Sequence, residues 1–151
     1  MCLTSINIYK LKQVRVSRRR YDIEDCKITC PLACYKAIEL ILDLKSEAVE
    51  KFGIISLNTK HRVAGIHIIG IGTLDSITIE PREVFKAAMI NNAGSIIAFH
   101  NHPSGDPTPS AGDIAITKRL KEAGMIMNIR LVDHLIIGED RYVSLRERGY
   151  L

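Results

Sequence analysis

The apolar run Ser-Ile-Ile-Ala-Phe at residues 95–99 constrains the fold of this chain more than any other feature. It is short and shows no polar alternation, which is typical of a strand that is covered on both faces. A strand of this kind needs helices packed on either side of its sheet. We therefore predict an α/β (α+β) fold, in which a mixed β-sheet is flanked by helices.

Three helices are expected around this strand. The first begins at Pro31, because proline favours a first helical position, and it stops at Gly53. Two more are expected at 82–94 and at about 111–123, ending at Gly94 and Gly124. The apolar face of the first helix consists of Ala33, Ala37, Ile41, Leu44 and Ala48.

The strands are expected from alternating or apolar runs that are bounded by turn residues. The run at 8–16 contains lysines and is expected at a sheet edge, where it could pair with another chain. The oligomeric state is otherwise left open. The remaining strands are expected at 54–57, 63–71, 76–79, 95–99, 129–138 and 142–145.

The composition is that of an ordinary globular domain. The chain has 151 residues, of which 46% are hydrophobic and 25% are charged. No apolar run approaches the roughly 20 residues that a membrane span requires. The first residues are too polar for the core of a signal peptide. We therefore expect a cytoplasmic protein with no membrane partner.

Positive charge is concentrated at the amino terminus. The net charge is +4, and the first 20 residues contain no acidic side chain. We treat residues 1–28 as a basic amino-terminal extension and 29–151 as the folded domain. The extension could bind nucleic acid through its phosphates, or form a solvated strand edge or flexible arm. The basic residues among the first 20 are Lys10, Lys12, Arg15, Arg18, Arg19 and Arg20.

The four cysteines do not have the C-x-x-C spacing of common zinc sites. Pro31 also interrupts any helix that would align the last three on one face. We expect reduced thiols, with a disulfide or a cysteine metal site as the alternatives. The cysteines are Cys2, Cys26, Cys30 and Cys34.

Two histidines follow the central strand with one residue between them. In an extended chain, His100 and His102 point the same way. Asp113 follows a loop that is rich in proline, and two imidazoles with one carboxylate can hold zinc while leaving a fourth position open. Alternatively, the histidines are ordinary polar residues, and Asp113 completes a capping box that begins at Ser110.

The spacing of these residues resembles the JAMM motif of MPN-type metallohydrolases. The fuller text, AFHNHPSGDPTPSAGDIAIT at 98–117, LVDHLIIG at 131–138 and YVSLRERGYL at 142–151, closely resembles the RadC family. The resemblance covers roughly residues 29–151 and implies the JAMM/MPN architecture, which is related to that of cytidine deaminases. RadC proteins often carry an amino-terminal helix–hairpin–helix region, which this chain is expected to lack.

The resemblance also implies roles for individual residues. His100, His102 and Asp113 would hold Zn²⁺, and Ser110 would lie near the developing oxyanion. JAMM enzymes use an upstream glutamate as general base; we assign it to Glu50, with Glu47 as the alternative. The implied reaction is hydrolysis of an amide or isopeptide bond, as in a metallopeptidase. The peptide or isopeptide substrate is not identified by the sequence.

Other functions compete with hydrolysis. The name RadC links the family to DNA repair without fixing a chemistry, so a non-catalytic module that binds nucleic acid or protein, in DNA repair or mobile elements, is the alternative. The letters HNH at 100–102 do not indicate an HNH nuclease, whose residues are spread over a longer motif, although a zinc phosphodiesterase stays open. The deaminase signature is absent.

Asp133 and His134 also match the RadC pattern. They could support the metal ligands from behind or form a buried, hydrogen-bonded pair in the core. We favour the core pair.

Overall fold

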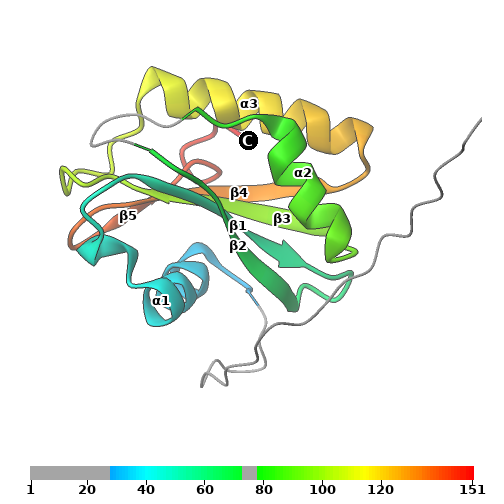
Figure 1. Ribbon diagram of the computed structural model, residues 1–151, viewed down its shortest axis with the longest axis horizontal. Coiled ribbons are helices and arrows are strands. Elements are labelled where there is room, and N and C mark those ends of the chain that lie inside the picture. The colour runs from blue at the N-terminus through cyan, green and yellow to red at the C-terminus, as the bar shows by residue number, and fades with distance from the viewer. Residues whose placement is uncertain (1–27, 73–77) are drawn as a thin grey trace, which may run out of the picture.

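The computed structural model describes residues 28–72 and 78–151 and shows one five-stranded sheet between two helical layers (Figure 1). The strand order is β2-β1-β3-β4-β5. The predicted mixed sheet flanked by helices is therefore confirmed. The elements are α1 (Pro31–Leu42), η2 (Leu44–Ser46), β1 (Lys51–Leu57), β2 (Val63–Ile71), α2 (Pro81–Ile90), β3 (Ser95–Asn101), α3 (Ala111–Ile126), β4 (Arg130–Ile137) and β5 (Tyr142–Ser144).

The parallel pair β3–β4 lies inside an otherwise antiparallel sheet. β1 pairs antiparallel with both β2 and β3, and β4 pairs antiparallel with β5. Parallel neighbours need a crossover connection, which α3 provides here. Every residue of β3 is buried, as the apolar run at 95–99 predicts, and the strand continues through His100 and Asn101.

The sheet has a hydrophobic core on each face. Ile96 and Ala98 of β3 pack in the cluster that includes Leu120 of α3. Ile97 and Phe99 pack in the cluster on the opposite face, which includes residues of α1. Figure 1 shows α1 on one side of the sheet and α2 and α3 on the other. His100 continues the series of Ile96 and Ala98, so its side chain lies on the α3 side.

The first helix is shorter than predicted. It ends at Leu42, and Asp43 adopts a left-handed conformation whose N–H donates to the Glu39 carbonyl. This cap stops the helix, although apolar residues continue at helical spacing beyond it. Within the expected apolar face only Ala37 and Leu44 are buried, and Ala48 is exposed.

Gly53, the predicted helix stop, is instead the third residue of β1. A Cβ at this position would lie 2.6 Å from the His67 carbonyl oxygen and would overlap the Phe99 ring. The glycine therefore permits close strand packing, and β1 begins at Lys51 rather than at residue 54.

The other two glycines also do not end helices. α2 ends at Ile90, before Gly94, and α3 continues through Gly124 to Ile126. Gly124 lets the helix pack closely, since a Cβ there would lie 2.5 Å from the Ile129 carbonyl oxygen. Of the predicted strand at 76–79, the first two residues lie outside the described residues, and 78–79 form no strand.

The predicted strand at 8–16, the basic segment Lys10–Arg20, Cys2 and Cys26 all lie outside the described residues. Cys30 and Cys34 are free thiols, exposed and buried respectively. Within residues 28–72 and 78–151, no helix has the length and apolar character needed to cross a membrane.

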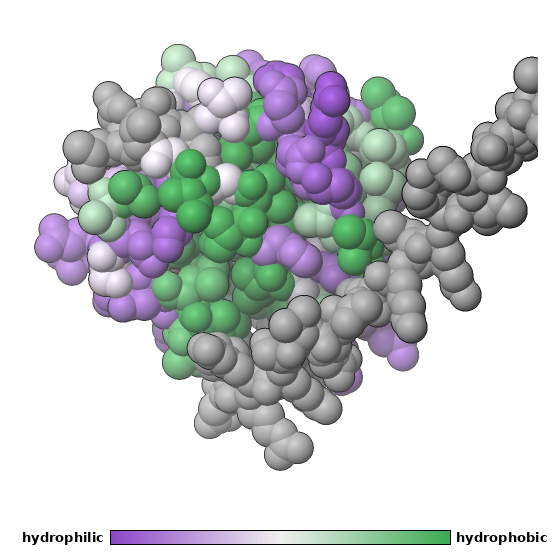
Figure 2. All heavy atoms as spheres, viewed as in Figure 1, coloured by the Kyte–Doolittle hydropathy of each residue, from purple (hydrophilic) through white to green (hydrophobic). Residues whose placement is uncertain are grey.

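One sheet edge carries apolar side chains. β2 is the edge strand next to β1, and Ile68 and Ile71 are exposed on it. Figure 2 shows hydrophobic residues near the centre of the visible face, where Figure 1 places β2, with hydrophilic residues beside them. His100 and His102 lie two strands away from β2, on β3 and just after its end.

Asn101, the last residue of β3, joins that strand to the segment before β1. Its Oδ1 accepts from the Lys51 N–H at 2.8 Å, and its Nδ2 donates to the Val49 carbonyl at 3.1 Å. The side chain is buried, so these two bonds replace water for both backbone groups. Asn101 therefore holds the backbone on both sides of Glu50.

We expect Asn101→Ala to lower the free energy of unfolding by about 1–3 kcal/mol, because it leaves buried backbone groups without partners. Amide exchange at Lys51 should accelerate, measured by hydrogen exchange with NMR detection. Asn58→Ala is the matched control, since Asn58 Oδ1 accepts from the amides of Lys60 and Arg62 in a turn. It should accelerate exchange at those two amides only. Unchanged hydrogen-exchange protection of the Lys51 amide in Asn101→Ala would contradict the proposed role of the Asn101 hydrogen bonds.

Candidate metal centre

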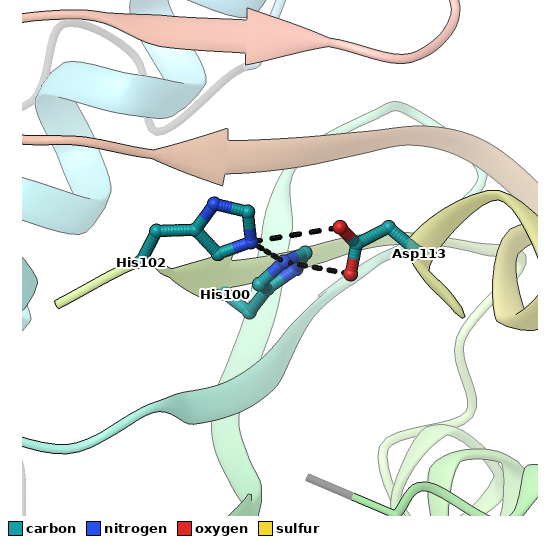
Figure 3. Close-up of side chains that lie close together, drawn as sticks. All are labelled: His100, His102 and Asp113. Carbon is teal, nitrogen blue, oxygen red and sulfur yellow. Dashed lines mark hydrogen bonds and ion pairs between the residues drawn. The ribbon is translucent and has the colours of Figure 1, made fainter. Parts of the chain in front are cut away.

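His100 and His102 converge because strand pairing continues past the end of β3. The His102 N–H donates to the Ile137 carbonyl of β4 at 2.9 Å, which keeps the backbone extended for one more residue. The Nε2 atoms of the two histidines lie 3.1 Å apart. The predicted convergence is therefore present, as Figure 3 shows.

Asp113 reaches the same point from the first turn of α3. Its Oδ1 lies 3.1 Å from His100 Nε2, and its Oδ2 lies 3.5 Å from His102 Nε2. Figure 3 shows the carboxylate facing both imidazoles. The ligand atoms of the three side chains all lie within 4.8 Å of one another, so together they could hold a metal ion.

The alternative interpretation of Asp113 is also correct, because a capping box is present. Ser110 Oγ accepts from the Asp113 N–H, while the N–H and hydroxyl of Ser110 donate to Asp113 Oδ2, each at 2.7 Å. These bonds use only one carboxylate oxygen. Oδ1 takes no part in the box and faces His100. The cap therefore orients the carboxylate toward the histidines.

The loop between His102 and Ser110 is tightly packed. Gly105 has a φ of 83°, which favours glycine, and a Cβ at Gly138 would overlap the Gly105 carbonyl oxygen. Asp106 Oδ1 accepts from the Thr108 amide and from Arg141. The loop is thus held against the turn that follows β4.

A hydrogen bond to this loop also determines which ring nitrogen of His102 carries the proton. Nδ1 of His102 lies 2.8 Å from the Asp106 carbonyl oxygen, which can only accept a hydrogen bond. Nδ1 must therefore carry a proton, and in the neutral ring Nε2 offers its lone pair. This is the arrangement expected when a carbonyl orients a metal-binding histidine.

The donor set fits zinc. Nitrogen and oxygen ligands at about 2.0–2.1 Å from a tetrahedral ion lie about 3.3 Å from one another. His100 Nε2 lies 3.1 Å from His102 Nε2 and 3.1 Å from Asp113 Oδ1, close to this distance, and the ligand atoms of all three side chains lie within 4.8 Å of one another. The three side chains are thus close enough together to share one metal ion.

The electrostatics of the site favour positive charge between these side chains. The hydrogen bond with Asp113 raises the pKa of His102, helped by the Asp106 carbonyl and the charges of Asp113 and Glu50. Burial opposes ionisation of Asp113, but hydrogen bonds with the two histidines outweigh it and hold its pKa well below the usual range. A proton or a cation therefore stabilises the carboxylate.

Glu50 and Glu47, the two glutamates considered as a base, differ in their surroundings. Glu50 is only 7% exposed, and its charge contributes to the raised pKa of His102, so its carboxylate acts on the site. Glu47 is partly exposed and forms an ion pair with Lys51 Nζ at 2.6 Å. Asn101 fixes the backbone that carries Glu50.

His134 contacts the site directly, which the preferred core-pair interpretation did not include. Its Nε2 lies 2.9 Å from His100 Nδ1, and the ring is fully buried. Burial lowers its pKa well below the usual value, which keeps the ring neutral. Asp133 belongs to the core instead, accepting from the Ser144 hydroxyl and the Arg146 amide.

Sequence reasoning missed Thr117. Its Oγ1 donates to the Asp113 carbonyl at 2.5 Å and lies 2.7 Å from His134 Nδ1. A threonine four residues after a candidate ligand, on the same helix, stands on the same face. That spacing was the available signal, but it does not reveal contact with β4.

Comparison with known proteins identifies the family. The model of the RadC-like JAB domain matches residues 28–150. A UPF0758 protein of Desulfitobacterium hafniense (strain DSM 10664 / DCB-2) is 53% identical over 102 residues, 68% of this chain and 45% of the relative. One from Caldanaerobacter subterraneus is 50% identical over 111 residues, 74% and 48% of the two chains. One from Listeria monocytogenes serotype 4b is 46% identical over 128 residues, 84% and 56%.

The chain spans about half the length of the curated relatives that it matches, and their names state no activity. The matched region contains all the residues of the candidate site, from Glu50 to His134. With the five-stranded mixed sheet and the His-x-His and Asp cluster in place, this chain belongs to the RadC-like JAB domain family.

Proposed function

We propose that this protein is a zinc-dependent hydrolase of the JAMM type that cleaves an amide or isopeptide bond. The observation that carries the proposal is the convergence of His100, His102 and Asp113, whose ligand atoms lie within 4.8 Å of one another. Three protein ligands leave a fourth position for water or substrate, as in catalytic zinc sites.

His100, His102 and Asp113 would hold the zinc ion. When bound, zinc supplies Lewis acidity, which polarises a carbonyl and brings the pKa of a bound water toward about 7. The buried side of the site is formed by His100 and Asp113, while His102 is partly exposed. Substrate would therefore approach from the side of His102.

Glu50 would act as the general base. Glu50 is buried and its charge acts on His102, so it lies within electrostatic range of the proposed site. It would accept a proton from the attacking water and deliver it to the leaving nitrogen. The Asn101 bonds on either side of Glu50 would keep its backbone fixed during both transfers.

Ser110 has a structural role in the site, separate from any catalytic role. Its hydroxyl proton is donated to Asp113 Oδ2. To stabilise a developing oxyanion, Ser110 would have to turn this proton away from Asp113 and toward the substrate. The Ser110 amide would still hold Asp113 Oδ2 in place.

The metal site predicts one zinc ion per chain. His100→Ala, His102→Ala and Asp113→Ala should each reduce bound zinc strongly, measured by elemental analysis after dialysis. His67→Ala is the control, because His67 lies on β2 outside the cluster. Zinc content equal to wild type in all three ligand variants would refute the site.

The base assignment predicts that Glu50→Gln keeps zinc but loses about 10²–10⁴-fold in the rate of hydrolysis. The rate would be measured on peptide and isopeptide libraries. Glu47→Gln is the matched control and should retain activity, because Glu47 pairs with Lys51. Full activity in Glu50→Gln would show that another group is the base, and a zinc-loaded wild type that cleaves no library member would argue against amide hydrolysis.

A further inference from the structure

We propose that Thr117 and His134 form a hydrogen-bond relay that sets the proton position of His100 and so holds its Nε2 lone pair toward the metal site. The relay rests on the proposed zinc site and deepens it. His100, Thr117 and His134 are each at most 1% exposed, so solvent does not supply alternative partners.

The relay begins at the Asp113 carbonyl oxygen, which can only accept a hydrogen bond. Thr117 Oγ1 lies 2.5 Å from the Asp113 carbonyl oxygen, and two oxygens this close repel unless a proton lies between them. The carbonyl has none, so the single hydroxyl proton of Thr117 points at it. Toward His134, Thr117 can then offer only a lone pair.

The second step fixes His134. Its Nδ1 lies 2.7 Å from Thr117 Oγ1, so Nδ1 must carry the proton that this bond needs. A charged ring is disfavoured because His134 is fully buried, with the Phe52 ring packed edge-on at 5.4 Å. The neutral ring has one N–H, so Nε2 of His134 is an acceptor.

The third step reaches the ligand. His100 Nδ1 lies 2.9 Å from His134 Nε2 and must donate to it. In the neutral ring His100 Nε2 is then left with a lone pair, which faces His102 Nε2 and Asp113 Oδ1. His102 is set independently by the Asp106 carbonyl, so both histidines present lone pairs to one point. A cation at that point would be stabilised by both lone pairs.

The relay also ties together the elements that carry the ligands. His100 belongs to β3, His134 to β4, and Thr117 and Asp113 to α3. Because the relay ends on the backbone of Asp113, the ligand from the strand and the ligand from the helix are joined behind the site. We therefore treat Thr117 and His134 as positioning residues.

The test compares zinc affinity in full-length variants by competition with a chromophoric chelator. Thr117→Val removes the hydroxyl at nearly constant shape and should weaken zinc binding about 10–100-fold, as should His134→Gln. Thr117→Ser keeps the hydroxyl and should bind as wild type does. Ser144→Ala is the control, since Ser144 binds Asp133 and does not contact His100. Urea unfolding would confirm that each variant is folded.

Nitrogen-15 NMR of the histidine rings in zinc-free protein provides a readout that needs no metal. We expect a proton on Nδ1 of both His100 and His134, and none on His134 Nε2. A proton on His134 Nε2, or wild-type zinc affinity in both Thr117→Val and His134→Gln, would overturn the relay while leaving the zinc site intact. Equal weakening by Ser144→Ala would also overturn it. Absence of zinc binding by the wild type would instead refute the proposed function.

Discussion

The parallel pairing of β3 with β4 is the interaction on which the site depends. It continues to the His102 amide and therefore aligns both histidines on one side of the sheet. Parallel strands require a crossover, and the crossover here is the loop and helix that carry Asp113. The same register sets His134 beside Ala98, one pleat away from His100. One strand–helix–strand unit thus supplies every proposed ligand and the relay behind them.

The carboxylate of Asp113 connects local stability with the site. Capping boxes normally serve only the helix end, and this one uses Oδ2 in that way. Because the box holds the carboxyl plane, Oδ1 is directed at His100. The helix therefore gains its cap from the same group that completes the cluster, and burial of the carboxylate is offset by bonds on both sides.

Local patterns in the sequence were enough for the central strand and the histidine pair. The apolar run at 95–99 and the two-residue period of an extended chain led directly to a buried β3 and converging imidazoles. The end of α1 could not be predicted in this way. Apolar residues continue at helical spacing past Asp43, whereas the helical backbone ends there. Thr117 and the burial of Glu50 were also hidden, since each depends on a partner distant in the chain: His134 for Thr117, and Asn101 for the segment carrying Glu50.

The segment His100-Asn101-His102 contributes to two parts of the proposed site. The pleat of β3 sends the two imidazoles to one face and the Asn101 amide to the other. On that other face, Asn101 binds the backbone on both sides of Glu50. A single extended segment therefore positions the proposed metal ligands and the proposed base at the same time. A change in its register would displace both, because a one-residue slip exchanges the two faces of the strand.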